Sequence, residues 1–256
     1  MRVKIYARPE KLMPDILGLC PGCGHLLFDK AIFEVLEEMG IMGRAIGVFG
    51  IGCGNGLVRL RELDRVQAAH GQAAAVATGI KRSLFGRPIV FTRQGDGDCA
   101  AIGLGYLLNA AARGERITVF MINNANFGTT GGQMAPTTII GQVTTTTPAG
   151  REAKAHGYPL HLPELLAGMK GVAYCARGAL NSPANYQRTK RYMKTALEKQ
   201  IDDVGFSFVD ILSPCPPDWH LTPVESLRWM EEKMLPEFPL GEFKNCLLYT
   251  SPSPRD

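Results

Sequence analysis

The stretches IVFTRQGDGDCAAIG, residues 89–103, and ITVFMINNANFGTTGGQ, residues 117–133, decide the fold of this 256-residue chain. Each begins with a short apolar and β-branched run and then turns into a segment rich in glycine, aspartate or asparagine. The patterns predict strands over residues 88–92 and 117–122, with a helix over residues 98–113 between them. Strands that are apolar along their whole length are typical of parallel sheets covered on both faces.

The same alternation of strand and helix continues on both sides of these stretches. Together the elements predict an α/β fold, a mostly parallel sheet with helices on both faces, whose ligands bind at the carboxyl ends of the strands. The polar stretch over residues 123–158 is long for a loop, and loops of that length are usually functional. Further strands are expected at residues 45–51, 172–176 and 206–212, and further helices at 24–39, 68–83, near 162–167, after Ser182-Pro183 and from about Pro223.

The composition narrows the class of protein. The chain is 45% hydrophobic and 20% charged, with a formal net charge of +4. No stretch approaches the roughly 18 consecutive apolar residues of a membrane helix, and the first residues lack the apolar run of a signal peptide. We therefore expect no membrane association and a cytoplasmic location. The basic residues are dispersed, which argues against nucleic acid as a partner.

The length fits a single domain with one core. We assign residues 1–244 to that domain. The last residues, NCLLYTSPSPRD at 245–256, fit neither the alternation nor a capped helix and resemble translated sequencing-adaptor DNA. We interpret this segment as a non-native tail.

A glycine-flanked carboxylate marks the first candidate site. Gly95-Asp96-Gly97 follows one predicted strand, and Asn123-Asn124 ends the next. Adjacent parallel strands would bring both ends to one edge, where the Asp96 carboxylate and the Asn124 side-chain carbonyl are oxygen ligands suited to Mg²⁺. The helix after the glycine turn would aim free N–H groups at the same place. Turn residues after strands also arise by chance, but the combination predicts a site for a diphosphate bridged to Mg²⁺.

Cysteines form the second candidate site. In a reducing compartment, ligation of a metal or a cluster explains seven cysteines better than disulfides do. Thiolate ligands need turns in which several sulfurs converge and main-chain N–H groups stay free. A structural zinc, a redox pair and buried small side chains remain alternatives at this point. Four cysteines lie in turns beside Gly or Pro, namely Cys20, Cys23, Cys53 and Cys215, whereas Cys99 and Cys175 lie in apolar surroundings typical of a core.

Two histidines next to glycines are candidates for polar contacts at the same edge. His25 and His70 are expected at strand-to-helix connections, where either imidazole can donate to a diphosphate or to a substrate carboxylate. His70 is the better candidate for a catalytic role. Gly52, which precedes Cys53 in the turn IGCGNG, is a further candidate for contact with a cofactor.

Taken in order, six segments resemble the β subunit of 2-oxoacid:ferredoxin oxidoreductases, and they are most similar to the branched-chain type, which acts on 3-methyl-2-oxobutanoate (2-oxoisovalerate). The likeness runs through about Lys244. The segments are LCPGCGH at 19–25, IGCGNG at 51–56, AAHGQAAAVATGIK at 68–81, GDGDCAAIG at 95–103, MINNANFGTTGGQMAPTT at 121–138 and FSFVDILSPCPPDW at 206–219.

The resemblance implies two resident cofactors, thiamin diphosphate with Mg²⁺ and one [4Fe–4S] cluster. Asp96, Asn124 and the main-chain oxygen of Asn126 match the family's Mg²⁺ ligands. The cysteines that match its cluster ligands are Cys20, Cys23, Cys53 and Cys215. Coenzyme A would be a co-substrate.

The resemblance also implies partner subunits. Thiamin enzymes need a second domain whose glutamate contacts the aminopyrimidine, and this chain has length for only one such domain. An α subunit would supply the other, accompanied in the family by γ and ferredoxin-like δ subunits. The implied complex oxidatively decarboxylates 2-oxoacids to acyl-CoA and passes electrons to ferredoxin.

The chain departs from the family pattern at a few positions near the expected cofactor. His70-Gly71-Gln72 stands where this type commonly has His-Gly-Arg, and Phe127-Gly128-Thr129-Thr130 stands where it has Tyr-Gly-Met-Thr. A glutamate expected after the first turns of the following helix is replaced around Tyr106. Two alternatives therefore stay open: a non-redox thiamin diphosphate-dependent decarboxylase subunit, and a zinc-stapled assembly subunit without catalysis.

Overall fold

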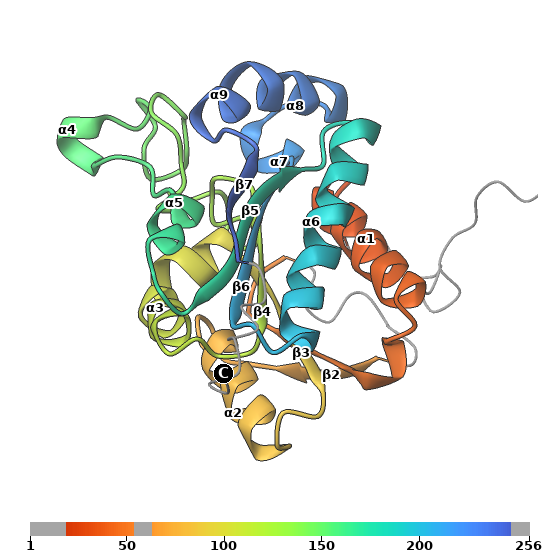
Figure 1. Cartoon of the computed structure of the whole chain (residues 1–256). Coiled ribbons are helices and arrows are strands. Elements are labelled where there is room, and N and C mark those ends of the chain that lie inside the picture. The colour runs from red at the N-terminus through yellow and green to blue at the C-terminus, as the bar shows by residue number, and fades with distance from the viewer. Residues whose placement is uncertain (1–18, 54–62, 247–256) are drawn as a thin grey trace, which may run out of the picture.

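The computed structural model describes residues 19–53 and 63–246 as a central sheet with helices packed on both sides (Figure 1). The sheet that these residues form has seven strands in the order β2-β1-β3-β4-β6-β5-β7. All neighbours pair in parallel except β5 and β7. The predicted α/β fold with a mostly parallel sheet is confirmed. In this part of the chain, no helix is both long and apolar enough to cross a membrane.

The elements have the following bounds. The strands are β1 (Ala45–Phe49), β2 (Asp64–Gln67), β3 (Ile89–Gly95), β4 (Thr118–Asn123), β5 (Val172–Ala179), β6 (Phe206–Leu212) and β7 (Gly241–Asn245). The helices are α1 (Gly24–Glu38), α2 (Ala73–Ser83), α3 (Leu104–Ala112), α4 (Ala153–His156), α5 (Leu162–Ala167), α6 (Pro183–Ile201), α7 (Pro216–Trp219), α8 (Pro223–Trp229) and α9 (Leu235–Glu237).

Side-chain alternation along the buried strands divides the core into two layers. Phe91 and Phe120 point to the face covered by α1 and α6, whereas Val90 and Val119 point to the face covered by α2, α3 and α5. Figure 1 shows α1 and α6 together on one side of the sheet. Because β1, β3 and β4 are parallel neighbours, their carboxyl ends lie at one edge of the sheet, which is where ligands of such sheets bind.

The predicted helix over residues 68–83 is wrong at its start. Helix α2 begins only at Ala73, and the preceding turn holds Gly71 in a left-handed conformation (φ +80°) that interrupts a helix. Strand β2 was not predicted, because every one of its residues is exposed and no apolar pattern marks this edge strand. His70 therefore lies between β2 and α2.

Two other predicted elements differ in detail. The helix expected over residues 98–113 is divided into a π-helical segment, Gly97–Ile102, and α3, and the N–H of Gly103 donates to the Asp98 carbonyl at 2.9 Å. Strand β1 ends at Phe49, so Ile51 lies in the following turn. The antiparallel edge strand β7 was also not predicted.

The boundary proposed at residue 244 falls within β7. Asn245 is the last residue of that strand, and the N–H of Cys246 donates to the Ala173 carbonyl at 2.8 Å. The rest of the segment interpreted as a tail, residues 247–256, lies outside the described residues. So does part of the turn IGCGNG, from residue 54 onward.

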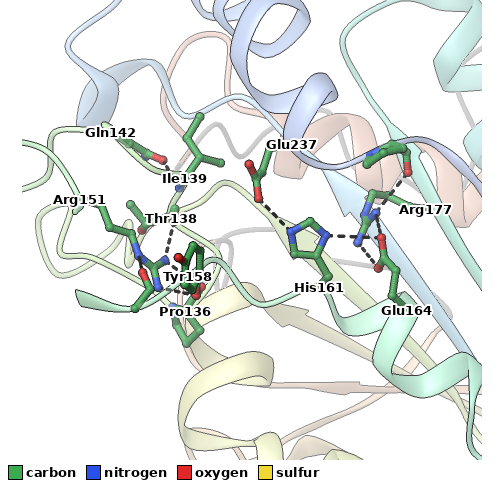
Figure 2. A network of polar contacts seen from close by, with 12 residues as sticks. Pro136, Thr138, Ile139, Gln142, Arg151, Tyr158, His161, Glu164, Arg177 and Glu237 are labelled. Atoms are coloured by element: carbon green, nitrogen blue, oxygen red, sulfur yellow. Dashed lines mark hydrogen bonds and ion pairs between the residues drawn. The ribbon is translucent and has the colours of Figure 1, made fainter. Parts of the chain in front are cut away.

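A buried arginine ties the last part of the chain to the sheet. Arg177 on β5 donates to Asp210 on β6 at 2.8 Å and, at 2.7 Å, to Glu164 on α5. Glu164 and Glu237 lie on either side of His161, and Glu237 accepts from that imidazole at 2.9 Å (Figure 2). This network joins α5 and α9 to β5 and β6.

A second buried arginine organises the long loop between β4 and α5. The Arg151 side chain lies among loop carbonyls (Figure 2) and donates to those of Pro136 at 2.9 Å, Gly157 at 3.0 Å and Tyr158 at 2.8 Å, as well as to that of Thr138. A guanidinium has five N–H donors in a fixed plane, so one side chain can satisfy several carbonyls. The loop is therefore ordered around one cation.

Replacing this cation tests its role. In Arg151→Met, the loop carbonyls lose their donors inside the protein, and we expect the free energy of unfolding to fall by about 3 kcal/mol. Urea denaturation measures this loss, and hydrogen exchange should show faster exchange over residues 135–158. The matched control is Arg116→Met, because the Arg116 side chain is 52% exposed and its ion pair with Asp203 is a surface one. Equal losses in the two variants would contradict the assignment.

Candidate functional site

Nine of the twelve predicted site residues meet at the carboxyl edge of the sheet. They surround a cavity of about 100 Å³ next to the ends of β1, β3 and β4. Its lining contains the predicted residues His25, Gly52, Cys53, His70, Gly95, Asp96, Gly97, Asn124 and Asn126, together with Ile51, Asp98, Phe127, Gly128, Thr129 and Thr130. Cys20, Cys23 and Cys215 are not among the lining residues.

Asp96 is the buried carboxylate of this edge. It follows the last residue of β3, is 1% exposed and accepts a hydrogen bond from Thr137 Oγ1 of the long loop. Burial raises the pKa of Asp96 to about 7, because the charged form loses its hydration and the bonds from Thr137 and the Gly97 N–H offset only part of that cost. A cation beside this carboxylate would supply the missing compensation.

Asn124 and Asn126 bring two more oxygens to the same point. With its nitrogen turned inward, the Asn124 amide donates to Asp96 Oδ1 at 3.0 Å and to the main-chain oxygen of Asn126 at 2.8 Å. With its oxygen turned inward, three oxygens from three residues meet, which is a donor set suited to Mg²⁺. Among the described residues, no three His, Cys, Asp or Glu side chains form a group for a single metal ion. The oxygens here come from one carboxylate, one amide and one carbonyl.

Asp98 connects three segments around His70. Its Oδ1 accepts from the N–H groups of Ile51 at 3.1 Å and Gly71 at 2.8 Å, and its Oδ2 accepts from Gln94 at 2.6 Å. His70 Nε2 lies 3.5 Å from the same Oδ1. The His70 side chain is 34% exposed and lines the cavity, with one ring nitrogen facing Asp98.

His25 lies in the first turn of α1 rather than at a strand-to-helix connection. It is 4% exposed, and its Nδ1 has no hydrogen-bond partner in the structure. Burial, with Arg93 nearby, holds the pKa of His25 well below its usual range, so the imidazole is neutral. A buried ring nitrogen without a partner at the wall of a cavity is a group that a ligand can satisfy.

The turns that carry Cys20, Cys23 and Cys215 pack against each other. The N–H of Cys23 donates to the Cys20 carbonyl at 3.0 Å, and the N–H of Gly24 reaches the Pro214 carbonyl at 3.4 Å. A Cβ on Gly24 would lie 2.2 Å from Ser213 Oγ, so only glycine allows this approach. The Cys-x-x-Cys pair is thereby held beside Cys215.

Cys53 lies in the turn after β1 and contacts the loop that follows β4. Thr129 Oγ1 donates to Cys53 Sγ at 3.1 Å, and the Cys215 thiol donates to Asp218 Oδ2 at 3.2 Å. A Cβ on Gly128 would lie 2.9 Å from Cys53 Sγ and 3.2 Å from Asp218 Oδ2. The close approach at Gly128 therefore places Cys53 near Asp218, which in turn contacts Cys215.

Electrostatic interactions link the four thiols, although among the described residues no three of them form a group for a single metal ion. Burial raises the pKa of Cys23 to about 11, and Cys53 and Cys20 add to that increase. Burial raises the pKa of Cys215 well above its usual range, with Asp218 and Cys53 contributing. Such thiols keep their protons until a cation replaces them. Cys99 and Cys175, by contrast, are both 0% exposed in the core, as predicted.

Four functional neighbours were missed from sequence. Asp98 directly follows the Gly-Asp-Gly turn, so a second acidic residue at a strand end was the available signal. Asp218 lies three residues after Cys215. Thr137 lies far along a threonine-rich loop, and Arg93 reads as one charge in an apolar strand, so neither position had a local signal.

Comparison with known proteins gives the following relatives. A family model described as "Thiamine pyrophosphate enzyme, C-terminal TPP binding domain" matches residues 51–211. The ketoisovalerate oxidoreductase subunit VorA of Methanothermobacter marburgensis is 41% identical over 249 residues, covering 97% of this chain and 52% of the relative. The 2-oxoglutarate synthase subunit KorB of Methanothermobacter thermautotrophicus is 35% identical over 240 residues, covering 90% of this chain and 77% of the relative.

A solved structure shares the fold. The 2-oxoglutarate:ferredoxin oxidoreductase from Magnetococcus marinus, with 2-oxoglutarate, coenzyme A and succinyl-CoA bound, superposes with a TM-score of 0.73 at 23% identity. The match covers 97% of this chain and 87% of that one. The chain thus spans about half the length of the VorA relative and most of the length of the KorB relative.

The raised pKa of Asp96 predicts how stability depends on pH. The folded-state pKa of about 7 lies above the ordinary value, so the metal-free chain should lose stability as the pH rises from about 4 to about 7. The loss for this one carboxyl is at most about 4 kcal/mol. Asp96→Asn should remove that dependence, because its amide stays neutral.

Urea denaturation in EDTA at pH 5 and pH 8 measures this difference. Mg²⁺ at pH 8 should stabilise the parent chain and leave Asp96→Asn unchanged. Asp64→Asn, at an exposed position on β2, is the matched control. The same pH dependence in Asp96→Asn as in the parent would contradict the account.

Proposed function

This chain belongs to the 2-oxoacid:ferredoxin oxidoreductase family, among its thiamin diphosphate-binding β subunits, and we propose that it binds thiamin diphosphate through Mg²⁺ and carries one [4Fe–4S] cluster. The assembled enzyme would oxidatively decarboxylate a 2-oxoacid to acyl-CoA and pass the electrons to ferredoxin. One observation carries the proposal: a Cβ on Gly128 would lie 2.9 Å from Cys53 Sγ and 3.4 Å from the Asn124 amide. Gly128 is thus the one residue between the two candidate cofactor sites.

The proposed diphosphate site uses three kinds of donor. Asp96, Asn124 and the main-chain oxygen of Asn126 would hold Mg²⁺, and the N–H groups at the start of the segment after Asp96 would face the diphosphate. Gly95, Gly97 and Gly52 line the cavity without side chains. When bound, thiamin diphosphate supplies the electron sink for loss of carbon dioxide, and the cluster supplies the one-electron acceptor.

His70 is the proposed proton-handling group. Its Nε2 faces the Asp98 carboxylate, so the neutral ring carries its proton on Nε2 and presents the Nδ1 lone pair elsewhere. In this tautomer His70 accepts a proton at Nδ1, and the resulting imidazolium donates to an anionic group such as a substrate carboxylate.

His25 has a different proposed role. Its neutral imidazole lies at the cavity wall, and its main-chain N–H contacts Cys23. With the proton on Nδ1, His25 would donate to a diphosphate oxygen and satisfy the nitrogen that lacks a partner. Its position next to the Cys-x-x-Cys turn links the diphosphate site to the cysteines.

The four cysteines are the proposed cluster ligands. Cys20, Cys23, Cys53 and Cys215 lie in turns that bring thiols together, and thiolate is the ligand that iron–sulfur clusters use. The alternatives are a zinc ion at these cysteines, or no metal there in a non-redox decarboxylase subunit. Iron and acid-labile sulfide in the purified complex distinguish the proposal from both.

Partner subunits are part of the proposal. An α subunit would supply the glutamate for the aminopyrimidine, with γ and ferredoxin-like δ subunits completing the complex. The 41% identity to a ketoisovalerate oxidoreductase subunit supports a branched-chain 2-oxoacid as substrate, with coenzyme A as co-substrate. A cytoplasmic location remains a prediction.

Serine substitutions test the cluster assignment. Cys215→Ser should remove most of the iron, the acid-labile sulfide and the brown colour of the anaerobically purified complex, because a hydroxyl is a poor ligand for this cluster. The matched control is Cys175→Ser, since the Cys175 thiol is buried and donates to the Pro163 carbonyl instead. Full iron content in the Cys215→Ser complex would refute the ligand set. Zinc in place of iron would favour the structural or decarboxylase alternative.

Reconstitution tests the shared active site. Expressed alone, the chain should be inactive with every 2-oxoacid. Adding the subunit that carries the pyrimidine-binding glutamate should restore reduction of a low-potential acceptor that depends on both 2-oxoacid and CoA, with 2-oxoisovalerate preferred over 2-oxoglutarate and pyruvate. A preference for 2-oxoglutarate would reject only the substrate. Robust turnover by the isolated chain would reject the shared site.

A further inference from the structure

The short helix after Cys215 contacts the loop that bears the proposed Mg²⁺ ligands. Helix α7 begins at Pro216, directly after the cysteine, and ends at Trp219. Its Asp218 carboxylate accepts two hydrogen bonds at Oδ2, one from the Cys215 thiol at 3.2 Å and one from Asn126 Nδ2 at 2.8 Å. One oxygen atom therefore touches a proposed ligand of the cluster and a proposed ligand of Mg²⁺.

Trp219 fixes the other end of the same amide. Its indole Nε1 donates to Asn126 Oδ1 at 3.2 Å and to the Asn124 carbonyl at 3.1 Å. The Asn126 amide is thus held at its nitrogen by Asp218 and at its oxygen by Trp219. This leaves the main-chain oxygen of Asn126 directed toward Asp96 and Asn124.

The Asp218 carboxylate lies close to two of the proposed cluster ligands. Its Oδ2 accepts from the Cys215 thiol at 3.2 Å, and a Cβ built on Gly128 would lie 3.2 Å from that oxygen and 2.9 Å from Cys53 Sγ. Gly128 provides no side chain to separate Asp218 from Cys53, and Arg93 acts on Cys53 with the opposite sign. Thiolates next to a carboxylate form a strongly anionic site.

We infer that Asp218 is a positioning residue that couples the two cofactor sites and lowers the reduction potential of the cluster. An added electron is less stable beside a fixed negative charge, and net charge around a cluster is one of the factors that set its potential. The same carboxylate holds the Asn126 amide, so the segment that supplies the Mg²⁺ ligands is anchored to the segment that supplies a cysteine. The inference rests on the proposed function, because it requires a cluster at these cysteines.

Potentiometry of the reconstituted complex separates the two effects. Asp218→Asn keeps the size of the side chain and an oxygen that can accept from Asn126, but it removes the charge. We expect full iron content and a midpoint potential, measured by redox titration followed by electron paramagnetic resonance, that is shifted to a higher value. Asp218→Glu keeps the charge and should stay close to the parent. Asp202→Asn, exposed at the end of α6, is the matched control.

Trp219→Phe tests the anchoring separately. It removes the indole donor and leaves the charge of Asp218, so the midpoint potential should not change. Mg²⁺-dependent binding of thiamin diphosphate, measured by calorimetry, should weaken about fivefold, the size expected for one lost neutral hydrogen bond. Unchanged binding in this variant would overturn the anchoring role.

The outcomes distinguish this inference from the proposed function. A parent complex without iron would reject the cluster itself. A parent complex with iron, combined with an unchanged potential in Asp218→Asn, would overturn the inference and leave the function intact. If Asp218→Asn assembles no cluster, Asp218→Ser takes its place in the titration, and the same upward shift is expected.

Discussion

The distance between the two halves of the site depends on one buried ion pair. Arg93 on β3 donates to both carboxylate oxygens of Asp29 on α1, at 2.7 and 3.1 Å, and also to the Cys53 carbonyl at 3.1 Å. Arg93 lies three residues before Asp96, and Asp29 lies six residues after Cys23. One guanidinium therefore fixes the strand of the diphosphate site, the helix of the Cys-x-x-Cys pair and the turn of a third cysteine relative to one another.

This ion pair positions the segments that it joins more than it stabilises the fold. Burial raises the pKa of Asp29 even though Arg93 opposes the rise, so the carboxylate keeps a desolvation penalty in spite of its partner. Buried pairs of this kind are often no more stabilising than apolar side chains of similar volume. Apolar side chains, however, have no donor for the Cys53 carbonyl. The arrangement is explained by the three segments it joins, because two proposed cofactor sites that lie close together need segments in fixed positions.

The sequence predicted those parts of the site that follow buried strands, and it missed those that depend on tertiary contacts. Asp96 and Asn124 end two apolar strands, so the rule that parallel strand ends share an edge was enough to place them together. Asp98 was missed because its importance lies in accepting from Ile51 and Gly71, which are distant in sequence. Strand β2 was missed because an exposed edge strand has no apolar pattern for a sequence to show.

Two of the four departures from the family pattern lie at the cavity. Gln72 and Tyr106 lie outside the cavity lining, whereas Phe127 and Thr129 belong to it. The Thr129 hydroxyl donates to Cys53 Sγ, so the departure at position 129 alters the surroundings of a cysteine. Phe127 lies edge-on to His70 with ring centroids 6.4 Å apart. Of these four positions, Phe127 is therefore the one whose side chain can change the shape of the space next to the proposed proton-handling group, and substrate preference in this chain should depend on it before the others.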